Sequence, residues 1–384
     1  MPRIFVPQEN RPGELRVAAV PETVKKLIQT GIEVEIQSGA GVHAGFPDTA
    51  YTALGASVAA SPVAAMRAAD VVMKISEPLV TEVDALKAGA ILFALLDPYR
   101  NLPLVRRLAE RQITSFAMEL VPRTTRAQAM DVLSSQASIA GYKAVLVGAS
   151  ELGKYLPMMM TAAGTVQPAR VVIVGAGVAG LQALATAKRL GAIVEVSDIR
   201  PAVKEQVESL GGRFIDLPEL GSGEGTGGYA KEVTKEFLEK QRAILQERLT
   251  HADLVVTTAQ VPGRRAPVLL TRAMIEGMKP GSVVVDLAAS TGGNCELTRV
   301  DEEVVHQGVR VLGPGNLAAT VPTDASLLFA RNVYNLLMLL WDKKEKRLHV
   351  PLEDEVVAGT LLTHGGEIVA APVAALLTDT AVRA

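Results

Sequence analysis

The sequence predicts an α/β protein with two Rossmann-like, doubly wound parallel-sheet domains joined by long helices, the second domain inserted into the first. Strand-like and helix-like segments alternate along most of the chain, and a glycine-rich turn follows a β-branched run near its middle. A long apolar helix then returns the chain after residue 321. Such alternation is typical of a parallel sheet covered by helices. The predicted domains are residues 1–135 with 322–384, and residues 136–321.

The composition excludes several classes of protein. The 384 residues are 48% hydrophobic and 21% charged, and the net charge of −2 gives no electrostatic case for nucleic acid or an anionic membrane. Cys295 is the only cysteine, and with five scattered histidines no metal site is predicted. The N-terminal stretch lacks an apolar signal core, and no segment reaches the ~20 apolar residues of a membrane helix. We therefore expect a soluble protein of a reducing compartment.

The first predicted domain alternates short strands and helices. Its strands are expected at 3–7, 33–37, 57–59, 71–74, 91–95 and 113–115, and its helices at 21–31, 48–54, 62–68 and 103–111.

A long helix over 131–155 is expected to link the domains. The run Met158–Met160 follows it, which we interpret as core or subunit-interface filler rather than part of a cofactor site. The second domain has predicted strands at 171–174, 193–197, 213–216, 254–257, 282–286 and 310–312. The tail, with a helix over 324–341 and strands at 348–350 and 367–369, is expected to pack on the first domain.

The glycine-rich turn lies between a strand and a helix predicted over 181–190. Gly175, Gly177 and Gly180 have G-x-G-x-x-G spacing, in which they allow a tight turn, close approach of a pyrophosphate and close helix–strand packing. Asp198 follows the next strand, where it would accept hydrogen bonds from the adenine ribose and favour NAD over NADP. Arg200 is an alternative partner for a 2′-phosphate. The pattern predicts a dinucleotide site.

Two further stretches allow a structural and a functional interpretation. Residues 220–228 are more than half glycine and precede Tyr229, so they are either a surface loop or a hinged lid over a nucleotide. Arg123, Gln128, Asp131 and Ser134 lie around the start of the long helix, where they form either ordinary capping or a polar site.

Across essentially its whole length the chain resembles the soluble NAD(H)-binding domain I of proton-translocating nicotinamide nucleotide transhydrogenase. The motifs that carry the resemblance are RPGELRVA (11–18), PRTTRAQAMDVLSSQASIAGYKAV (122–145), MMMTAAGT (158–165), VGAGVAGLQALATAKRLGA (174–192), VKEQVESLGG (203–212), GGYAKE (227–232), TTAQVPGRRAPVL (257–269) and VDLAASTGGNCELT (285–298).

Alanine dehydrogenases, which share the two-domain plan, are the alternative. Their active-site histidine is missing from the matching segment 91–97, and Ser290 stands where they carry an aspartate. Arg16 and Lys74 match their substrate-binding positions, but without the acid–base pair we interpret these two as vestigial or structural. A non-catalytic module that senses the NADH/NAD ratio is a third possibility.

The resemblance implies direct hydride transfer between NAD(H) on this chain and NADP(H) on a partner subunit, coupled to proton translocation. Such a reaction needs positioning rather than a general acid or base. The implied partners are a second copy of the chain, a membrane-spanning alpha piece and an NADP-binding beta subunit. They would place this cytoplasmic chain on the inner face of the cytoplasmic membrane.

The resemblance also assigns roles to residues. Arg123 would face the nicotinamide, Gln128 would hold its ribose, and Asp131 and Ser134 would orient its carboxamide. The remaining positions implied to bind NAD(H) are Gly175, Gly177, Val178, Gly180, Asp198, Ile199, Arg200, Gly228, Tyr229, Gln241 and Gln260. Of these, Gln260 would act through its backbone.

Overall fold

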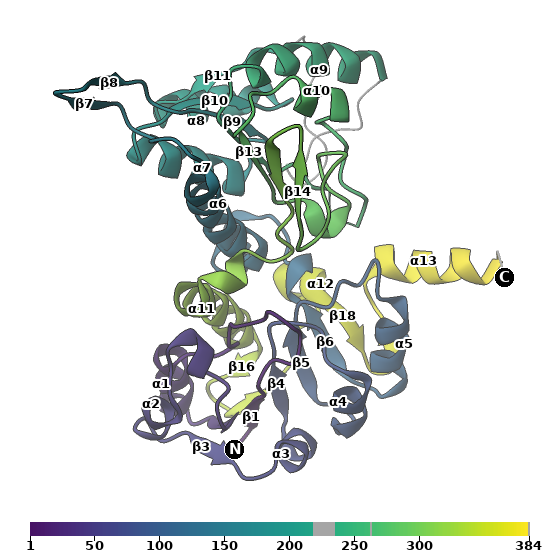
Figure 1. The fold of residues 1–384 in the computed structure, drawn as a ribbon. Coiled ribbons are helices and arrows are strands. Elements are labelled where there is room, and N and C mark those ends of the chain that lie inside the picture. The colour runs from purple at the N-terminus through teal and green to yellow at the C-terminus, as the bar shows by residue number, and fades with distance from the viewer. Residues whose placement is uncertain (218–234, 262, 383–384) are drawn as a thin grey trace. The chain divides into compact units, whose positions relative to one another are not determined.

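In the computed structural model, residues 1–217, 235–261 and 263–382 are described, the side chains of 235–238 and 378–382 excepted. The chain divides into two compact units, unit 1 (Met1–Gln136 and Ala319–Ala384) and unit 2 (Ala137–Ala318). Each contains one mainly parallel sheet with helices on both faces, which confirms the predicted fold class (Figure 1). The boundaries predicted after residues 135 and 321 lie one and three residues from those between the units.

Unit 1 is built on an eight-stranded sheet of order β19-β18-β6-β5-β4-β1-β2-β3. Its elements are β1 (Arg3–Val6), α1 (Pro21–Gln29), β2 (Glu33–Gln37), α2 (Asp48–Thr52), β3 (Ser57–Ala59), α3 (Pro62–Ala68), β4 (Val71–Met73), α4 (Val80–Ala85), β5 (Ile91–Ala94), α5 (Leu102–Glu110), β6 (Thr114–Ala117), α11 (Pro322–Leu340), β16 (Trp341–Asp342), β17 (Arg347–Leu348), α12 (Glu355–Thr360), β18 (Leu361–His364), β19 (Glu367–Ile368) and α13 (Ala371–Val382).

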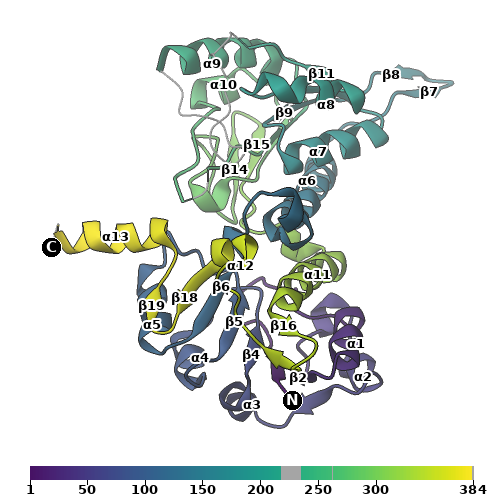
Figure 2. The same cartoon turned by 180° about the vertical axis from the view of Figure 1, so that it is seen from behind.

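Alternating residues of the unit 1 strands enter two separate cores. Ile4 and Val6 of β1 pack in a core with Phe329 of α11, whereas Phe5 packs in the opposite core with Leu108 of α5. This follows from the two-residue period of a strand, since both faces of the sheet are covered. At one edge β18 runs antiparallel to β6, and β19 antiparallel to β18 (Figure 2).

Unit 2 contains a seven-stranded sheet of order β11-β10-β9-β12-β13-β15-β14, in which only β14 is antiparallel to its neighbour among the described strands. Its elements are most of α6 (Val132–Glu151), then β7 (Met159–Thr161), β8 (Gly164–Val166), β9 (Arg170–Val174), α7 (Val178–Arg189), β10 (Ile193–Ser197), α8 (Lys204–Ser209), β11 (Arg213–Phe214), α9 (Lys235–Leu249), β12 (Leu254–Thr257), α10 (Arg272–Glu276), β13 (Val283–Asp286), β14 (Glu303–His306) and β15 (Val309–Leu312).

Two glycines let α6 approach the rest of unit 2 closely. A Cβ on Gly141 would lie 2.0 Å from the carbonyl oxygen of Ala179, and one on Gly148 would lie 2.4 Å from Leu254 Cδ1. Larger residues at either position would push the helix away from α7 or from the sheet. The small residues of this helix are therefore a packing requirement of unit 2.

The strand order fixes where ligands are expected in each sheet. In unit 1 the chain runs from β1 toward β3 and then from β4 toward β6, so the order reverses between β1 and β4. In unit 2 it reverses between β9 and β12. In doubly wound sheets, ligands bind beyond the carboxyl ends of the strands at such a switch point.

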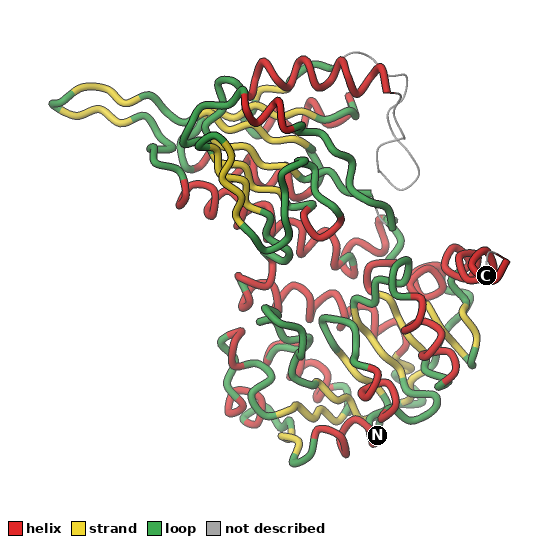
Figure 3. Tube along the Cα trace, turned by 45° about the vertical axis from the view of Figure 1, so that its right-hand side comes forward, coloured by secondary structure: helices red, strands yellow, loops and turns green. Residues whose placement is uncertain are grey.

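Several local expectations need correction. The linking helix ends at Glu151 rather than residue 155, and the nucleotide-domain helix begins at Val178 rather than residue 181. β17 pairs with β16 in a separate hairpin and does not join the main sheet. The methionine run belongs to the hairpin β7–β8, which projects from unit 2 (Figure 3). Every residue of its two strands is exposed, so the run is not core of this chain.

Candidate functional site

The glycine-rich turn of unit 2 joins the end of β9 to α7. Gly175 has a φ of +106°, and a Cβ there would lie 2.4 Å from Thr258 Oγ1. A Cβ on Gly180 would lie 1.8 Å from the carbonyl oxygen of Gly175. The chain itself therefore requires both glycines, the first for its left-handed backbone and both for close packing.

Gly177 is different, because nothing in the described chain explains it. Apart from the adjacent residues, no atom of the part of the chain that the structure describes lies within 4 Å of the position that its Cβ would take, and its φ of −75° suits any residue. Gly177 is the N-cap residue of α7, and Val178 behind it is 45% exposed. The first turn of a helix has N–H groups without intrahelical partners. Open space beside such groups fits the pyrophosphate of a dinucleotide.

Asp198 follows β10 and is only 8% exposed. Its Oδ2 accepts hydrogen bonds from the N–H of Ala176 (2.7 Å) and from Arg200 Nη2 (2.8 Å). Its Oδ1 accepts from the backbone N–H and the Nε of Arg200, both at 2.9 Å. A carboxylate offers about four lone-pair directions, so all are occupied. A ribose hydroxyl can therefore bind Asp198 only if the Arg200 guanidinium moves away. Ile199, the residue between these two, is half-buried.

The loop after β12 contacts its neighbours on both sides. Thr258 Oγ1 donates to the carbonyl oxygen of Gly175 (3.1 Å), and Gln260 Nε2 donates to that of Leu287 (2.7 Å). The side chain of exposed Gln260 therefore supports a loop. Its backbone contact with the nicotinamide-side ribose stays a prediction.

Gln241, a further predicted nucleotide ligand, lies in α9. Gln241 is 2% exposed, and its Oε1 has no hydrogen-bond partner among the residues that the structure describes. Gly228 and Tyr229, with the predicted lid, lie outside the described residues. Their roles stay predictions.

In unit 1 the structure brings the four predicted nicotinamide-facing residues together. Arg123, Gln128, Asp131 and Ser134 all line one hollow of about 250 Å³, with Pro122 and two threonines. Arg123 and Gln128 are exposed, whereas Asp131 and Ser134 are half-buried. The hollow thus gathers a cation, an amide, a carboxylate and a hydroxyl on one surface.

Asp131 also caps α6. Its Oδ1 accepts from the backbone N–H of Ser134 (2.9 Å) and its Oδ2 from the hydroxyl of Ser134 (2.5 Å). This is the capping arrangement that the sequence left open, and it positions both side chains at the rim of the hollow. The segment before Asp131 is held by α11, since Asn332 Nδ2 of that helix donates to the carbonyl oxygen of Ala129 (2.9 Å).

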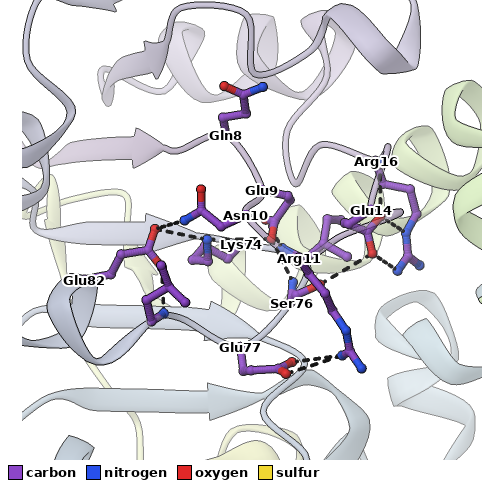
Figure 4. A network of polar contacts seen from close by, with 12 residues as sticks. Gln8, Glu9, Asn10, Arg11, Glu14, Arg16, Lys74, Ser76, Glu77 and Glu82 are labelled. Atoms are coloured by element: carbon purple, nitrogen blue, oxygen red, sulfur yellow. Dashed lines mark hydrogen bonds and ion pairs between the residues drawn. The ribbon is translucent and has the colours of Figure 1, made fainter. Parts of the chain in front are cut away.

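A second polar network fills the carboxyl end of β1 and β4 (Figure 4). Lys74 Nζ lies 3.6 Å from Glu9 Oε2 and 3.3 Å from Glu82 Oε1, and the side chains of Lys74 and Glu9 are 1% and 3% exposed. Arg16 forms a two-point ion pair with Glu14, with Nη2–Oε2 and Nε–Oε1 distances of 2.6 and 2.7 Å. Both cations that match the substrate-binding positions of alanine dehydrogenase are therefore already bound to carboxylates.

Burial raises the pKa of Glu9 in this network, and two further acidic residues near this edge also have raised pKa values. Burial raises the pKa of Glu119 to about 7, although its carboxylate accepts hydrogen bonds from the N–H groups of Leu96 (2.8 Å) and Asp97 (2.6 Å). Burial also raises the pKa of Asp97, whose φ is +45°. Sequence patterns missed both, because neither lies in a recognisable motif.

Other parts of the described chain offer less. A larger hollow of about 790 Å³ lies at the amino ends of β1, β5 and β6 and contains none of the predicted site residues. We give more weight to the smaller one, because it lies where the strands of a doubly wound sheet end. Within the described ranges, no group of three or more acidic, histidine or cysteine side chains could hold a metal ion. No helix there is long and apolar enough to cross a membrane.

Fold and site together define a two-unit α/β protein with a dinucleotide-type glycine turn. Residues 5–140 match the family model for the N-terminal domain of alanine dehydrogenase/PNT, and residues 144–371 match that for its C-terminal domain. The chain is 50% identical over 374 residues to the first part of NAD(P) transhydrogenase subunit alpha of Rhodospirillum rubrum, covering 96% of this chain and 97% of that protein. It is 33% identical over 342 residues to alanine dehydrogenase of Halomonas elongata, covering 85% and 86%.

A solved structure agrees. The transhydrogenase from Sinorhizobium meliloti superposes with a TM-score of 0.87 at 45% identity, covering 95% of this chain and 99% of that one. The chain belongs to the alanine dehydrogenase/PNT family, and within it to the NAD(P) transhydrogenase alpha subunits. The resemblance inferred from the motifs is thereby confirmed.

Proposed function

We propose that this chain is the NAD(H)-binding subunit of a proton-translocating NAD(P) transhydrogenase. NAD(H) bound in unit 2 exchanges a hydride directly with NADP(H) on a partner subunit. The single observation that carries the nucleotide site is Gly177, whose missing side chain leaves space for a pyrophosphate at the start of α7.

Two observations favour nucleotide-to-nucleotide transfer over amino-acid oxidation. Arg16 and Lys74 are each held by a buried carboxylate, which leaves little positive charge for a second carboxylate from an amino acid. The segment 91–97 also has no histidine for proton transfer. Hydride transfer between two nicotinamides requires no such group, only that the rings be held in line.

The polar hollow of unit 1 supports the assignment of Gln128 as a positioning group for the nicotinamide ribose, with Arg123, Asp131 and Ser134 around it. In unit 2, Gln241 Oε1, which has no hydrogen-bond partner among the described residues, is an acceptor for a donor group of the nucleotide. The NADP-binding beta subunit and a membrane-spanning alpha piece complete the enzyme, and they place the chain on the inner face of the cytoplasmic membrane.

The test compares two reactions. The isolated chain should bind NADH and should not reduce NAD with alanine. Reduction of an NAD analogue by NADPH should require the NADP-binding subunit. Alanine-dependent NADH formation by the isolated chain would replace this proposal with the alanine dehydrogenase alternative. NADH binding without transfer in the assembled complex would instead favour a sensing module.

Gln128→Asn tests the positioning role within that assay. We expect normal NADH affinity and a turnover reduced roughly 100-fold, because about 1 Å of misplacement can cost this much. Gln29→Asn, at an exposed amide on α1 of the same unit, is the matched control. Normal turnover of the Gln128 variant would remove Gln128 from the mechanism.

The hairpin β7–β8 supports a homodimer. Its strands are exposed on both faces, and Met158 and Met160 are 53% and 77% exposed. A two-stranded hairpin alone is marginally stable in water, and apolar side chains at such a site mark an interface. Sedimentation equilibrium should show a dimer for the wild type and a monomer for Met158→Asp/Met160→Asp. A dimer in both would place the interface elsewhere.

A further inference from the structure

Three loops leave neighbouring strands at the carboxyl edge of the unit 2 sheet. The glycine turn follows β9, residues 258–261 follow β12, and residues 287–295 follow β13; these strands are adjacent in the order β9-β12-β13. The first loop carries the recognisable glycine pattern. The loops after β12 and β13 are joined by Asn294, a buried residue of the loop after β13.

Asn294 is completely buried and uses all of its polar atoms on main chain. Its Nδ2 donates to the carbonyl oxygens of Ala259 and Pro267, both at 2.8 Å, and its Oδ1 accepts from the N–H of Ala259 at 3.0 Å. The side-chain amide therefore pairs with both groups of Ala259, as a neighbouring strand would. Few side chains can do this, because it requires a donor and an acceptor in one plane.

Asp286, also completely buried, holds the backbone of Asn294 in turn. Its Oδ2 accepts from the N–H of Asn294 (2.7 Å) and from the hydroxyl of Thr298 (2.7 Å). Its Oδ1 accepts from the hydroxyl of Thr257 (2.8 Å) at the end of β12. Thr258, which bonds to Gly175, lies between Thr257 and Ala259 in the chain, so these hydrogen bonds and the backbone together connect β13, the loop after β12 and the glycine turn.

The bonds of Asn294 and Asp286 lie on the β12–β13 side of the switch point. Asp198, on the side of β10, is placed for the adenosine half of a dinucleotide, and Gly177 lies at the pyrophosphate position between β9 and β12. The nicotinamide half must then extend over the loop after β12. Because Asn294 occupies both main-chain groups of Ala259, that loop presents the next peptide, at Gln260, to a ligand.

We propose that Asn294 is a positioning residue for the nicotinamide half of the bound dinucleotide, acting through the main chain of Ala259 and Gln260. The inference rests on the proposed NAD(H) site. It predicts that loss of Asn294 damages the binding of one half of the ligand only, which a purely structural role would not do.

The experiment measures the affinity of the purified full-length chain for NADH and for ADP-ribose, which lacks the nicotinamide. Asn294→Ala should weaken NADH binding roughly tenfold, the effect of one lost buried hydrogen-bonding group, and change ADP-ribose binding less than about twofold. Equal weakening of both ligands, or of neither, would overturn the role of Asn294. A wild-type chain that binds neither ligand would overturn the proposed function itself.

Ser282→Ala is the matched control. Ser282 is 2% exposed, and its hydroxyl donates to the carbonyl oxygen of Ala252 (3.0 Å) at the amino end of the same sheet. It should lower the thermal stability and leave both affinities unchanged. Since Asn294→Ala leaves three main-chain groups unpaired, Asn294→Ser, which keeps a hydroxyl group at this position, is the second variant if the first does not fold. It should show the same selective loss, larger for NADH than for ADP-ribose, and an equal loss for both ligands would count against the proposal.

Discussion

The switch points of the two sheets have the same strand topology, but different groups lie at them: charged side chains in unit 1 and main chain in unit 2. In unit 1, the segments after β1 and β4 meet in a buried ion pair between Glu9 and Lys74. In unit 2, the segments after β9 and β12 meet through Thr258 and Gly175, and Gly177 beside them faces open space. The ion pair fills the switch point of unit 1, whereas the switch point of unit 2 leaves main-chain groups accessible to a ligand. A shared fold therefore does not make two equivalent sites, because the residues at the strand ends decide what can enter.

The largest expected effect concerns the closed switch point. Lys74→Met should destabilise unit 1 by about 3–5 kcal/mol, because it leaves the Glu9 carboxylate buried without its cation. Denaturant unfolding followed by the fluorescence of Trp341, the only tryptophan and part of unit 1, measures it. Arg11→Ala, which breaks an exposed pair with Glu77, should cost less than about 1 kcal/mol. Equal losses in the two variants would show that the Lys74 network does not stabilise the unit.

A substitution at the switch point of unit 2 should change the affinity for the ligand more than the stability of the fold. Gly177→Ala places a methyl group where, apart from the adjacent residues, no described atom lies within 4 Å, so the free energy of unfolding should change by less than about 1 kcal/mol. The same methyl group would meet a pyrophosphate, and NADH affinity should fall roughly 100-fold, or about 2.7 kcal/mol. Gly180→Ala should also lower stability, since its Cβ would lie 1.8 Å from the carbonyl oxygen of Gly175. Unchanged NADH binding by Gly177→Ala would disprove the pyrophosphate placement.

The stability of unit 1 should also depend on pH, because it contains the buried carboxyl group of Glu119. Burial raises the pKa of Glu119 from 4.5 to about 7, so the folded state holds this proton more tightly than the unfolded state. The unit should therefore lose stability as the pH rises between these values, by at most roughly 3 kcal/mol. Glu119→Gln, neutral at every pH, should flatten the dependence when Trp341 fluorescence is followed from pH 4.5 to 7. An identical slope in both proteins would contradict the assignment.

The smallest predicted effect concerns ligand selection at the open switch point. Arg200→Ala removes two of the four hydrogen bonds on Asp198 and the positive charge beside it. The uncompensated carboxylate should repel a 2′-phosphate more strongly and accept ribose hydroxyls more readily. The ratio of the dissociation constants for NADPH and NADH should rise several-fold, as measured by fluorescence titration. A fall in that ratio would mean that Arg200 discriminates against NADPH.

The main architecture was predictable because the signals were local. The β-branched run at 171–174, the glycines after it and the acid at 198 identify a strand–turn–helix unit that the structure contains. The alternation in unit 1 predicted six parallel strands for the same reason. Two antiparallel strands were missed for different reasons: β14 pairs with the next strand, β15, across a tight turn that was not recognised, whereas β18 pairs with β6, which is distant in sequence and leaves no local pattern. The hairpin β7–β8 was missed because its apolar residues suggested burial.

The sequence predicted which residues belong to the site better than it predicted their contacts with one another. Arg123, Gln128, Asp131 and Ser134 line one hollow, although capping alone explained two of them equally well. The pairing of Asp198 with Arg200 could not be foreseen, because a bidentate pair two residues apart depends on side-chain rotamers. Asn294 lies in a motif that carried the family resemblance, yet only burial reveals that it serves the main chain of another loop.

The burial of Cys295 gives the experimenter a chemical probe. Its backbone N–H bonds to Asp286 (3.1 Å), the residue is 2% exposed, and burial raises the pKa of the thiol to about 11. A thiol reagent needs the exposed thiolate, so the folded chain should resist labelling at neutral pH. Because Cys295 is the sole cysteine, the rate of its alkylation would time the opening of this region of the sheet. For the same reason, a thiol reagent should label a cysteine engineered on the surface without labelling Cys295.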